Sequence, residues 1–157
     1  MRKRIVRTNQ PVHRPASSQS WMDLAQIATV EVTSEDPNFP IESVFSPDSG
    51  PGWRASEKGE QRVRLIFDHP VSLRHIQLNF LDPEHERTQE FTVQWSSERG
   101  QPQEIVRQQW NFSPSGATRE VEDYDVHLDQ VSILELLIKP DVTHHRAPAS
   151  LAAWRLA

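Results

Sequence analysis

Apolar side chains recur at every second position along much of the chain, which predicts strands rather than helices. Val63, Leu65 and Phe67 alternate with Arg62, Arg64 and Ile66. The segment 71–80 also alternates, but its parity switches near Arg74 and His75, and one extra residue there, a β-bulge, explains the switch. Because the short link 68–70 contains a proline, we interpret the two segments as an antiparallel hairpin.

The sequence predicts eight strands, most of them from this periodicity; the segment 131–138 is instead nearly continuously apolar, which indicates a central strand covered on both faces, with a helix as the alternative. We expect the eight strands at 28–32, 63–67, 71–80, 91–95, 104–110, 121–126, 131–138 and 151–156. Single helical turns are expected at 20–24 and 40–45, whereas the stretch 34–60 holds too many prolines and glycines for a regular element and is expected to be a long loop. Strands and turns at this spacing predict an all-β, two-sheet antiparallel sandwich.

The order of the strands also predicts where the loops lie. If each strand crosses the sandwich, successive connections alternate between its two ends, and the chain termini share one of them. The connections that then share the other end are 34–60, 82–88, 111–118 and 140–148. Loops gathered at one end of a rigid sandwich commonly carry the binding site.

Composition narrows the class of protein. A chain of 157 residues fits one domain, which we place at 20–157, and the absence of cysteine excludes disulfides and zinc–thiolate sites. Five of the 17 Lys and Arg residues fall in the first 14 positions, so we expect 1–19 to be a basic, flexible segment. The remainder holds 12 basic and 22 acidic residues, which makes nucleic-acid binding unfavourable.

No apolar leader or long apolar run is present, and we therefore expect a cytoplasmic protein without membrane insertion. A hydrolase nucleophile elbow, a zinc-protease motif and a glycine-rich phosphate loop are also missing from the sequence. Adjacent acids such as Glu122 and Asp123 point to opposite faces of a strand and do not form a catalytic pair. We therefore expect no enzymatic activity.

Several segments resemble one family. They are Val32-Thr33-Ser34-Glu35, Glu42-Ser43-Val44-Phe45, Gly52-Trp53-Arg54-Ala55, the alternating stretch 63–78, and Leu151-Ala152-Ala153-Trp154-Arg155-Leu156. Over roughly residues 26–157 this pattern resembles the discoidin, coagulation-factor type C or galactose-binding-like domain family. The resemblance implies a jelly-roll sandwich with Trp53 in its core, in which loops at one end bind sugars, lipid head groups or proteins. Some similar domains are scaffolds in single-strand-break repair.

The resemblance also implies a calcium loop before Trp53. Family members carry several acidic residues there, and here Asp48 matches one of them while Ser46 stands in the place of another. Because calcium takes six to eight oxygen ligands, many of them carboxylates, the case for a bound calcium rests on Asp48 and backbone carbonyls. Whether the protein binds calcium is left open.

Seven residues of the loop end are candidate ligand contacts, because they carry charge, imidazole or an aromatic ring. They are Arg54, His85, Arg87, Phe112, His144, His145 and Arg146. Each also has a purely structural alternative: Arg54 can pair with Asp48 or Glu57, Phe112 can fill the sandwich, and the histidines can be solvated. A second alternative is an adventitious metal site that combines Asp48, His144 and His145 with the loop 82–87.

These observations predict a noncatalytic binding module. It recognises an intracellular protein partner or a carbohydrate through the loop end; the alternatives are a carbohydrate-binding module proper and a DNA-repair-type scaffold. A carbohydrate site predicts an exposed aromatic ring beside Arg54 or Arg146, whereas a protein site predicts a flat surface without a pocket. The identity of the ligand and the oligomeric state stay open.

Overall fold

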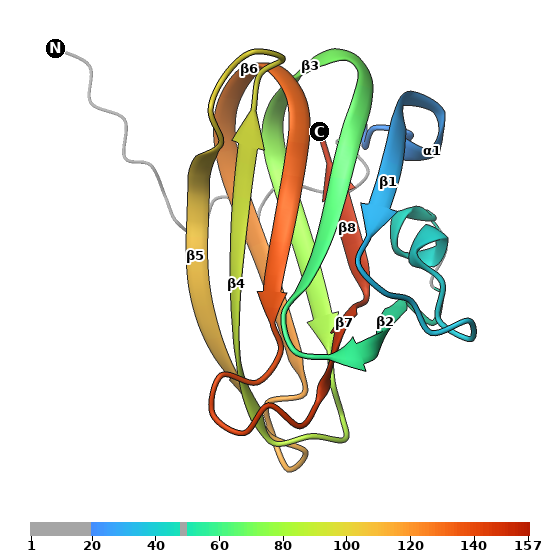
Figure 1. Ribbon diagram of the computed structural model, residues 1–157, viewed down its shortest axis with the longest axis vertical. Coiled ribbons are helices and arrows are strands. Elements are labelled where there is room, and N and C mark those ends of the chain that lie inside the picture. Colours follow the sequence, from blue (N-terminus) through green and yellow to red (C-terminus); the bar gives the residue numbers. More distant parts are fainter. Residues whose placement is uncertain (1–19, 48–49) are drawn as a thin grey trace, which may run out of the picture.

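The computed structural model describes residues 20–47 and 50–157, so the predicted N-terminal segment and Asp48 lie outside the described residues (Figure 1). It contains eight strands, one α-helical turn and one 3-10 helix. They are α1 (Leu24–Ile27), β1 (Ala28–Val32), η3 (Ile41–Phe45), β2 (Trp53–Lys58), β3 (Gln61–Leu81), β4 (Arg87–Ser96), β5 (Gln103–Phe112), β6 (Arg119–Lys139), β7 (Pro148–Leu151) and β8 (Ala153–Leu156). Neither of the two helical segments among these residues is long and apolar enough to cross a membrane.

Strands β3 and β6, each 21 residues long, build both layers of the sandwich. They pair antiparallel from Gln61–Ile138 to Leu81–Arg119, and both bend over at the top of Figure 1. The first half of β3 pairs with β1, and its second half pairs with β8. One layer is therefore β1-β3-β6-β4-β5, the other is β8 with the remaining halves of β3 and β6, and β2 pairs with β7.

The core lies between these layers. Residues of β3 alternate between buried and outward positions over most of the strand, as the sequence pattern requires. In β6 the residues 134–136 are all buried, at the place where this strand lies between β3 and β4. Trp53 is 1% exposed, and its indole Nε1 donates to the carbonyl of Ser34 at 3.0 Å, so the long loop is tied to the core. This burial agrees with the place in the core that the family resemblance implies for Trp53.

The structure confirms the predicted β-bulge. The backbone amides of Arg74 and His75 both donate to the carbonyl of Ala157, at 2.7 and 2.8 Å, so two residues of β3 lie opposite one residue at the end of the chain. His75 and Ile76 are consecutive and both buried, which is the parity switch seen in the sequence.

The predicted hairpin at 63–80 is wrong. Its two halves do not pair with each other, because each pairs with the matching half of β6, which also joins the predicted strands 121–126 and 131–138 into one. Alternation reports which face of a strand is buried, not which strand is its neighbour. Two smaller expectations also fail: the helical turn begins at Leu24, not Ser20, and the long loop contains β2.

Candidate functional site

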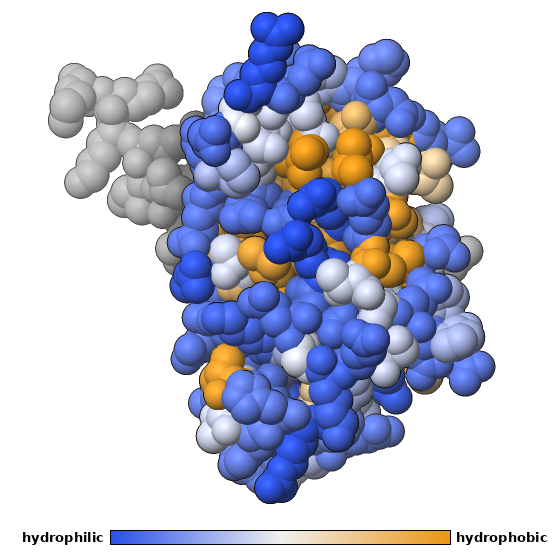
Figure 2. Space-filling model, in the orientation of Figure 1, coloured by the Kyte–Doolittle hydropathy of each residue, from blue (hydrophilic) through white to orange (hydrophobic). Residues whose placement is uncertain are grey.

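Three connections meet at one end of the sandwich, the lower end in Figure 1. They are β3–β4 (82–86), β5–β6 (113–118) and β6–β7 (140–147), and their convergence confirms the alternation argument for these three. Figure 2 shows that hydrophilic residues cover most of this end. The loops enclose an open hollow of about 770 Å³, lined by Glu84, His85, Glu86, Arg87, Thr88, Asn111, Phe112, Ser113, Asp141, Thr143, His144, Arg146 and Ala147.

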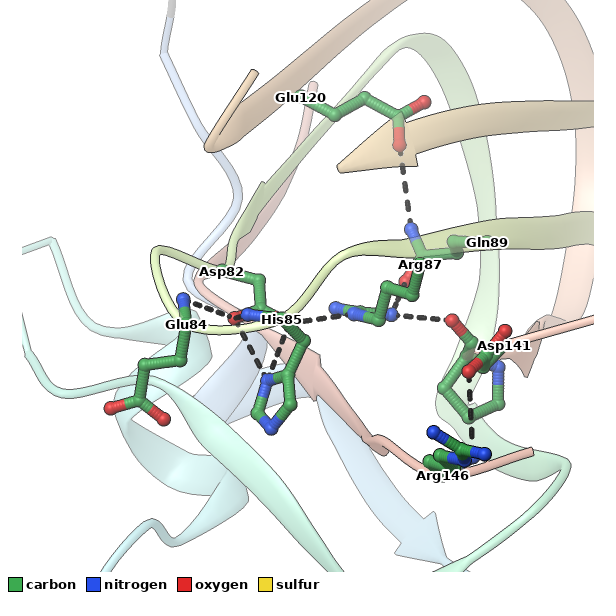
Figure 3. A network of polar contacts seen from close by, with 9 residues as sticks. Asp82, Glu84, His85, Arg87, Gln89, Glu120, Asp141 and Arg146 are labelled. Atoms are coloured by element: carbon green, nitrogen blue, oxygen red, sulfur yellow. Dashed lines mark hydrogen bonds and ion pairs between the residues drawn. The ribbon is translucent and has the colours of Figure 1, made fainter. Parts of the chain in front are cut away.

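Arg87, the first residue of β4, lies buried in the wall of this hollow (Figure 3). Its Nε donates to Asp82 Oδ2 at 2.6 Å, and its Nη1 donates to the Pro140 carbonyl at 2.7 Å and to Gln89 Oε1 at 3.1 Å. The guanidinium carbon lies 4.5 Å from the centre of the Phe112 ring, a cation–π contact. Arg87 therefore connects the β3–β4 loop, β5 and the β6–β7 loop.

Asp82 shapes the β3–β4 loop. One of its carboxylate oxygens accepts from the backbone amides of Glu84 at 2.9 Å and His85 at 3.1 Å, and the His85 ring contacts both oxygens. Although burial alone raises the pKa of Asp82, the Glu84 amide and the Arg87 guanidinium hold it below its usual range. The residue is thus a carboxylate that fixes the loop and orients His85.

Asp141 has the same role in the β6–β7 loop. Its carboxylate accepts from the backbone amides of Thr143 at 3.2 Å, His144 at 3.0 Å and Arg146 at 3.4 Å. Burial opposes ionisation, but the amides of His144, Arg146 and Thr143 lower the pKa of Asp141. The chain passes through the left-handed region at His145, with φ 56°, and turns His144 and Arg146 to the hollow.

Gln89 and Glu120 continue this polar cluster inward from Arg87 (Figure 3). Gln89 is fully buried, and its Nε2 donates to Glu120 Oε1 at 3.4 Å. Burial and the neighbouring carboxylate of Glu122 raise the pKa of Glu120 to about 9. Glu120 therefore holds its proton at neutral pH, which removes most of the cost of burying this carboxyl group.

Five of the seven candidate residues from the sequence line the hollow: His85, Arg87, Phe112, His144 and Arg146. Phe112 is only 1% exposed, so it fills the sandwich beneath Arg87 as its structural alternative states. Among the residues that line the hollow, Phe112 is the only Phe, Tyr or Trp. The exposed aromatic ring that a carbohydrate site predicted beside Arg146 is therefore not found in this wall.

The other two candidates lie outside the wall. His145 is exposed, and the guanidinium carbon of Arg54, in β2, lies 4.4 Å from the centre of the half-buried Phe39 ring. The Arg54 amide also donates to the Phe39 carbonyl at 3.2 Å. The ring beside Arg54 is thus only half-buried and lies away from the hollow, and the alternative partner Asp48 lies outside the described residues.

The sequence interpretation missed the residues that organise the site, above all Asp82, Asp141 and Glu120. A signal for the first two was present, because each loop opens with an Asp followed two and three residues later by the amides it accepts from. Nothing local marks Glu120 as buried. In residues 20–47 and 50–157, no group of three His, Asp or Glu side chains is placed to hold a metal ion.

Comparisons with known proteins identify the fold. No protein-family model matches the sequence, and no curated protein is significantly similar to it. Solved structures do match: the family 32 carbohydrate-binding module of Clostridium perfringens NanJ in complex with galactose has a TM-score of 0.64 and 13% identity, over 87% of this chain and 96% of that one.

Two further structures widen this comparison. The family 32 carbohydrate-binding module of AlyQ, in complex with 4,5-unsaturated mannuronic acid, has a TM-score of 0.64 and 15% identity, over 88% of this chain and 98% of that one. A chain of reduced XRCC1 bound to the DNA polymerase β catalytic domain has a TM-score of 0.58 and 15% identity, over 83% and 94%. The chain thus has the fold of these structures, the galactose-binding-like, discoidin-type β-sandwich that the sequence pattern resembles.

Proposed function

We propose that this protein is a noncatalytic module that binds a carbohydrate in the hollow at the loop end. The observation that carries the proposal is the hollow itself, about 770 Å³ in volume, in which His85, Arg87, His144 and Arg146 converge from two separate loops. Sugar hydroxyls both donate and accept hydrogen bonds, and such a wall offers both kinds of partner.

The rigidity of the wall supports this function. Asp82 and Asp141 each fix one loop through backbone amides, and Arg87 holds the two loops together. A site whose loops are held before the ligand arrives loses less conformational entropy on binding. The matched structures of NanJ and AlyQ modules were solved with sugars bound, which supports the same class of ligand for this chain.

A protein partner is the second candidate. It is favoured by the match to XRCC1, which was solved in complex with a polymerase domain. A protein-recognition surface was expected to be flat and without a pocket, and the loop end instead has a hollow. We therefore place the protein partner after the carbohydrate, and nucleic acid after both because the acidic body opposes phosphate binding. The predicted cytoplasmic location stays a prediction.

A thermal-shift screen of the full chain against neutral and acidic monosaccharides and oligosaccharides tests the proposal. Binding to the folded state raises the melting temperature, and calorimetry of each hit gives its Kd. We expect His144→Ala and Asn111→Ala to weaken binding about tenfold, since both residues line the hollow and are exposed. His127→Ala is the matched control, because His127 is exposed on β6 and does not line the hollow. Absence of any sugar binding, or equal binding by all three variants, contradicts this function.

A further inference from the structure

The wall of the hollow contains a buried donor that has no acceptor. Nε and Nη1 of Arg87 are bonded to Asp82, Gln89 and Pro140, but Nη2 has no partner among the described residues. The side chain is 0% exposed, so this nitrogen does not reach the open part of the hollow, and Arg87 acts from within the wall.

Two acidic groups inside the site, Asp82 and Asp141, do not compete as acceptors for this nitrogen, whereas Glu120, further inward, also has a buried oxygen, Oε2, without a partner among the described residues. The carboxylates of Asp82 and Asp141 are occupied by backbone amides and, for Asp82, by Arg87. Figure 3 shows the carboxylate of Glu84 pointing away from Arg87. Glu84 and Glu86 are both exposed, as Arg146 is, so water and salt screen all three charges alike.

Arg146 supplies an available positive charge on the rim. Its backbone amide is bonded to Asp141, whereas its guanidinium has no hydrogen-bond partner among the described residues and is exposed. Figure 3 places Arg146 beside Asp141. A ligand in the hollow thus meets one exposed guanidinium, that of Arg146, at the rim.

The absence of an exposed ring in the wall points in the same direction. A neutral sugar ring gains much of its binding from stacking its apolar face on an aromatic side chain, but Phe112 is covered by Arg87 and 1% exposed. Affinity in this hollow must therefore come mainly from polar contacts. The strongest polar contact available to an arginine is a charge-assisted bond to a carboxylate.

We propose that the hollow prefers an acidic sugar, a hexuronate, over the corresponding neutral sugar. This inference rests on the proposed function. The ligand carboxylate pairs with the guanidinium of Arg146, which is exposed at the rim of the hollow.

Calorimetric titration of the full chain with galacturonate, glucuronate and mannuronate tests the preference. Each acid is compared with its methyl ester and with its parent hexose, which keep the ring but lack the charge. We expect at least one hexuronate to bind about tenfold more tightly than both neutral forms, equivalent to about 1.4 kcal/mol. In 0.5 M NaCl the ratio should fall to roughly threefold or less, because salt screens the pair. Sodium acetate, a carboxylate without a ring, should not bind.

Substitution of the rim arginine locates the preference. Arg146→Gln should abolish the difference between acid and ester, whereas Arg99→Gln, which changes an exposed arginine in the β4–β5 turn, should leave that difference intact. Equal binding of acid and ester by the unaltered protein, or an unchanged preference in Arg146→Gln, overturns this inference but leaves carbohydrate binding in place. Absence of binding by every sugar overturns the proposed function as well.

Discussion

Two buried arginine–carboxylate pairs in this protein serve different ends. At the loop end, Arg87 and Asp82 are both buried, with side chains 0% and 7% exposed. On the outward face of β3 and β6, Glu135 is also buried at 6%, but its partners Arg64 and Arg62 are 33% and 47% exposed. Both side chains of the Arg87–Asp82 pair are thus shielded from solvent, whereas at Glu135 only the carboxylate is shielded and its two arginines are partly exposed.

The two pairs also differ in how completely their hydrogen-bonding groups are used. Arg64 donates to Glu135 from Nε at 2.9 Å and lies within 2.8 Å through Nη2, Arg62 adds a third contact at 3.3 Å, and Gln94 donates to the other oxygen. Arg87 instead keeps one nitrogen unpaired. A shared carboxylate under several donors tolerates the loss of one, whereas a buried pair with a single cation does not. This difference agrees with the binding site proposed at the loop end.

The largest loss of stability should follow substitution of the buried cation, Arg87. Arg87→Met leaves the buried Asp82 carboxylate with the Glu84 and His85 amides and the His85 ring but without its guanidinium partner, and we expect the free energy of unfolding to fall by about 3 kcal/mol. Urea denaturation monitored by tryptophan fluorescence measures this loss. The double variant with Asp82→Asn should recover part of it, because the buried charge is then gone. A loss below about 1 kcal/mol in the single variant would contradict the conclusion that solvent is excluded from both members of this pair.

Glu120, at the inner end of the same cluster, should make stability fall as pH rises. The pKa of Glu120 is raised to about 9 in the folded protein, so the folded state holds a proton that the unfolded chain releases near pH 4.5. The stabilisation is complete below pH 4.5 and is lost as pH rises to about 9, by at most about 1.4 kcal/mol per pH unit. Glu120→Gln, neutral throughout, should lose this component and therefore gain in stability relative to the unaltered protein between pH 5 and 9.

Denaturation curves at several pH values for both proteins measure the slope. Glu122→Gln serves as the second variant, since Glu122 contributes to the raised pKa of Glu120 and its removal should move the transition to lower pH. Parallel pH profiles for Glu120→Gln and the unaltered protein would show that this carboxyl group does not titrate on unfolding.

The sequence predicted the layers of this fold better than its connections. Alternation placed β1, the buried faces of β3 and β6, and the bulge at Arg74, because each of these depends on which side chains avoid water. Strand pairing depends on residues far apart in the chain. For this reason a proline at 70 suggested a hairpin, although β3 bends there and keeps β6 as its partner on both sides.

The sequence predicted where the candidate site lies, but not which buried residues hold its loops in place. Counting strands brought 82–88, 111–118 and 140–148 together, and charge and ring chemistry selected five of the residues that line the hollow. The same reasoning treated Arg87 as a surface contact, whereas it is buried and linked to Asp82 and Pro140. Burial of a charged group is set by packing against distant segments, and no local pattern records it.

The smallest loss of stability should follow substitution of a partly exposed cation, Arg64. Arg64→Met makes the same chemical change as Arg87→Met, but Glu135 keeps Arg62 and Gln94, and water reaches the vacated position. We expect a loss of about 0.5–1 kcal/mol in the free energy of unfolding, and a smaller loss in 0.5 M NaCl because an exposed pair is screened by salt. The same urea denaturation measures both variants. A loss equal to that of Arg87→Met would show that the burial of the carboxylate alone, and not the burial of the whole pair, decides the stability of each cluster. The loop end and the sheet face would then differ only in the nitrogen of Arg87 that has no partner among the described residues.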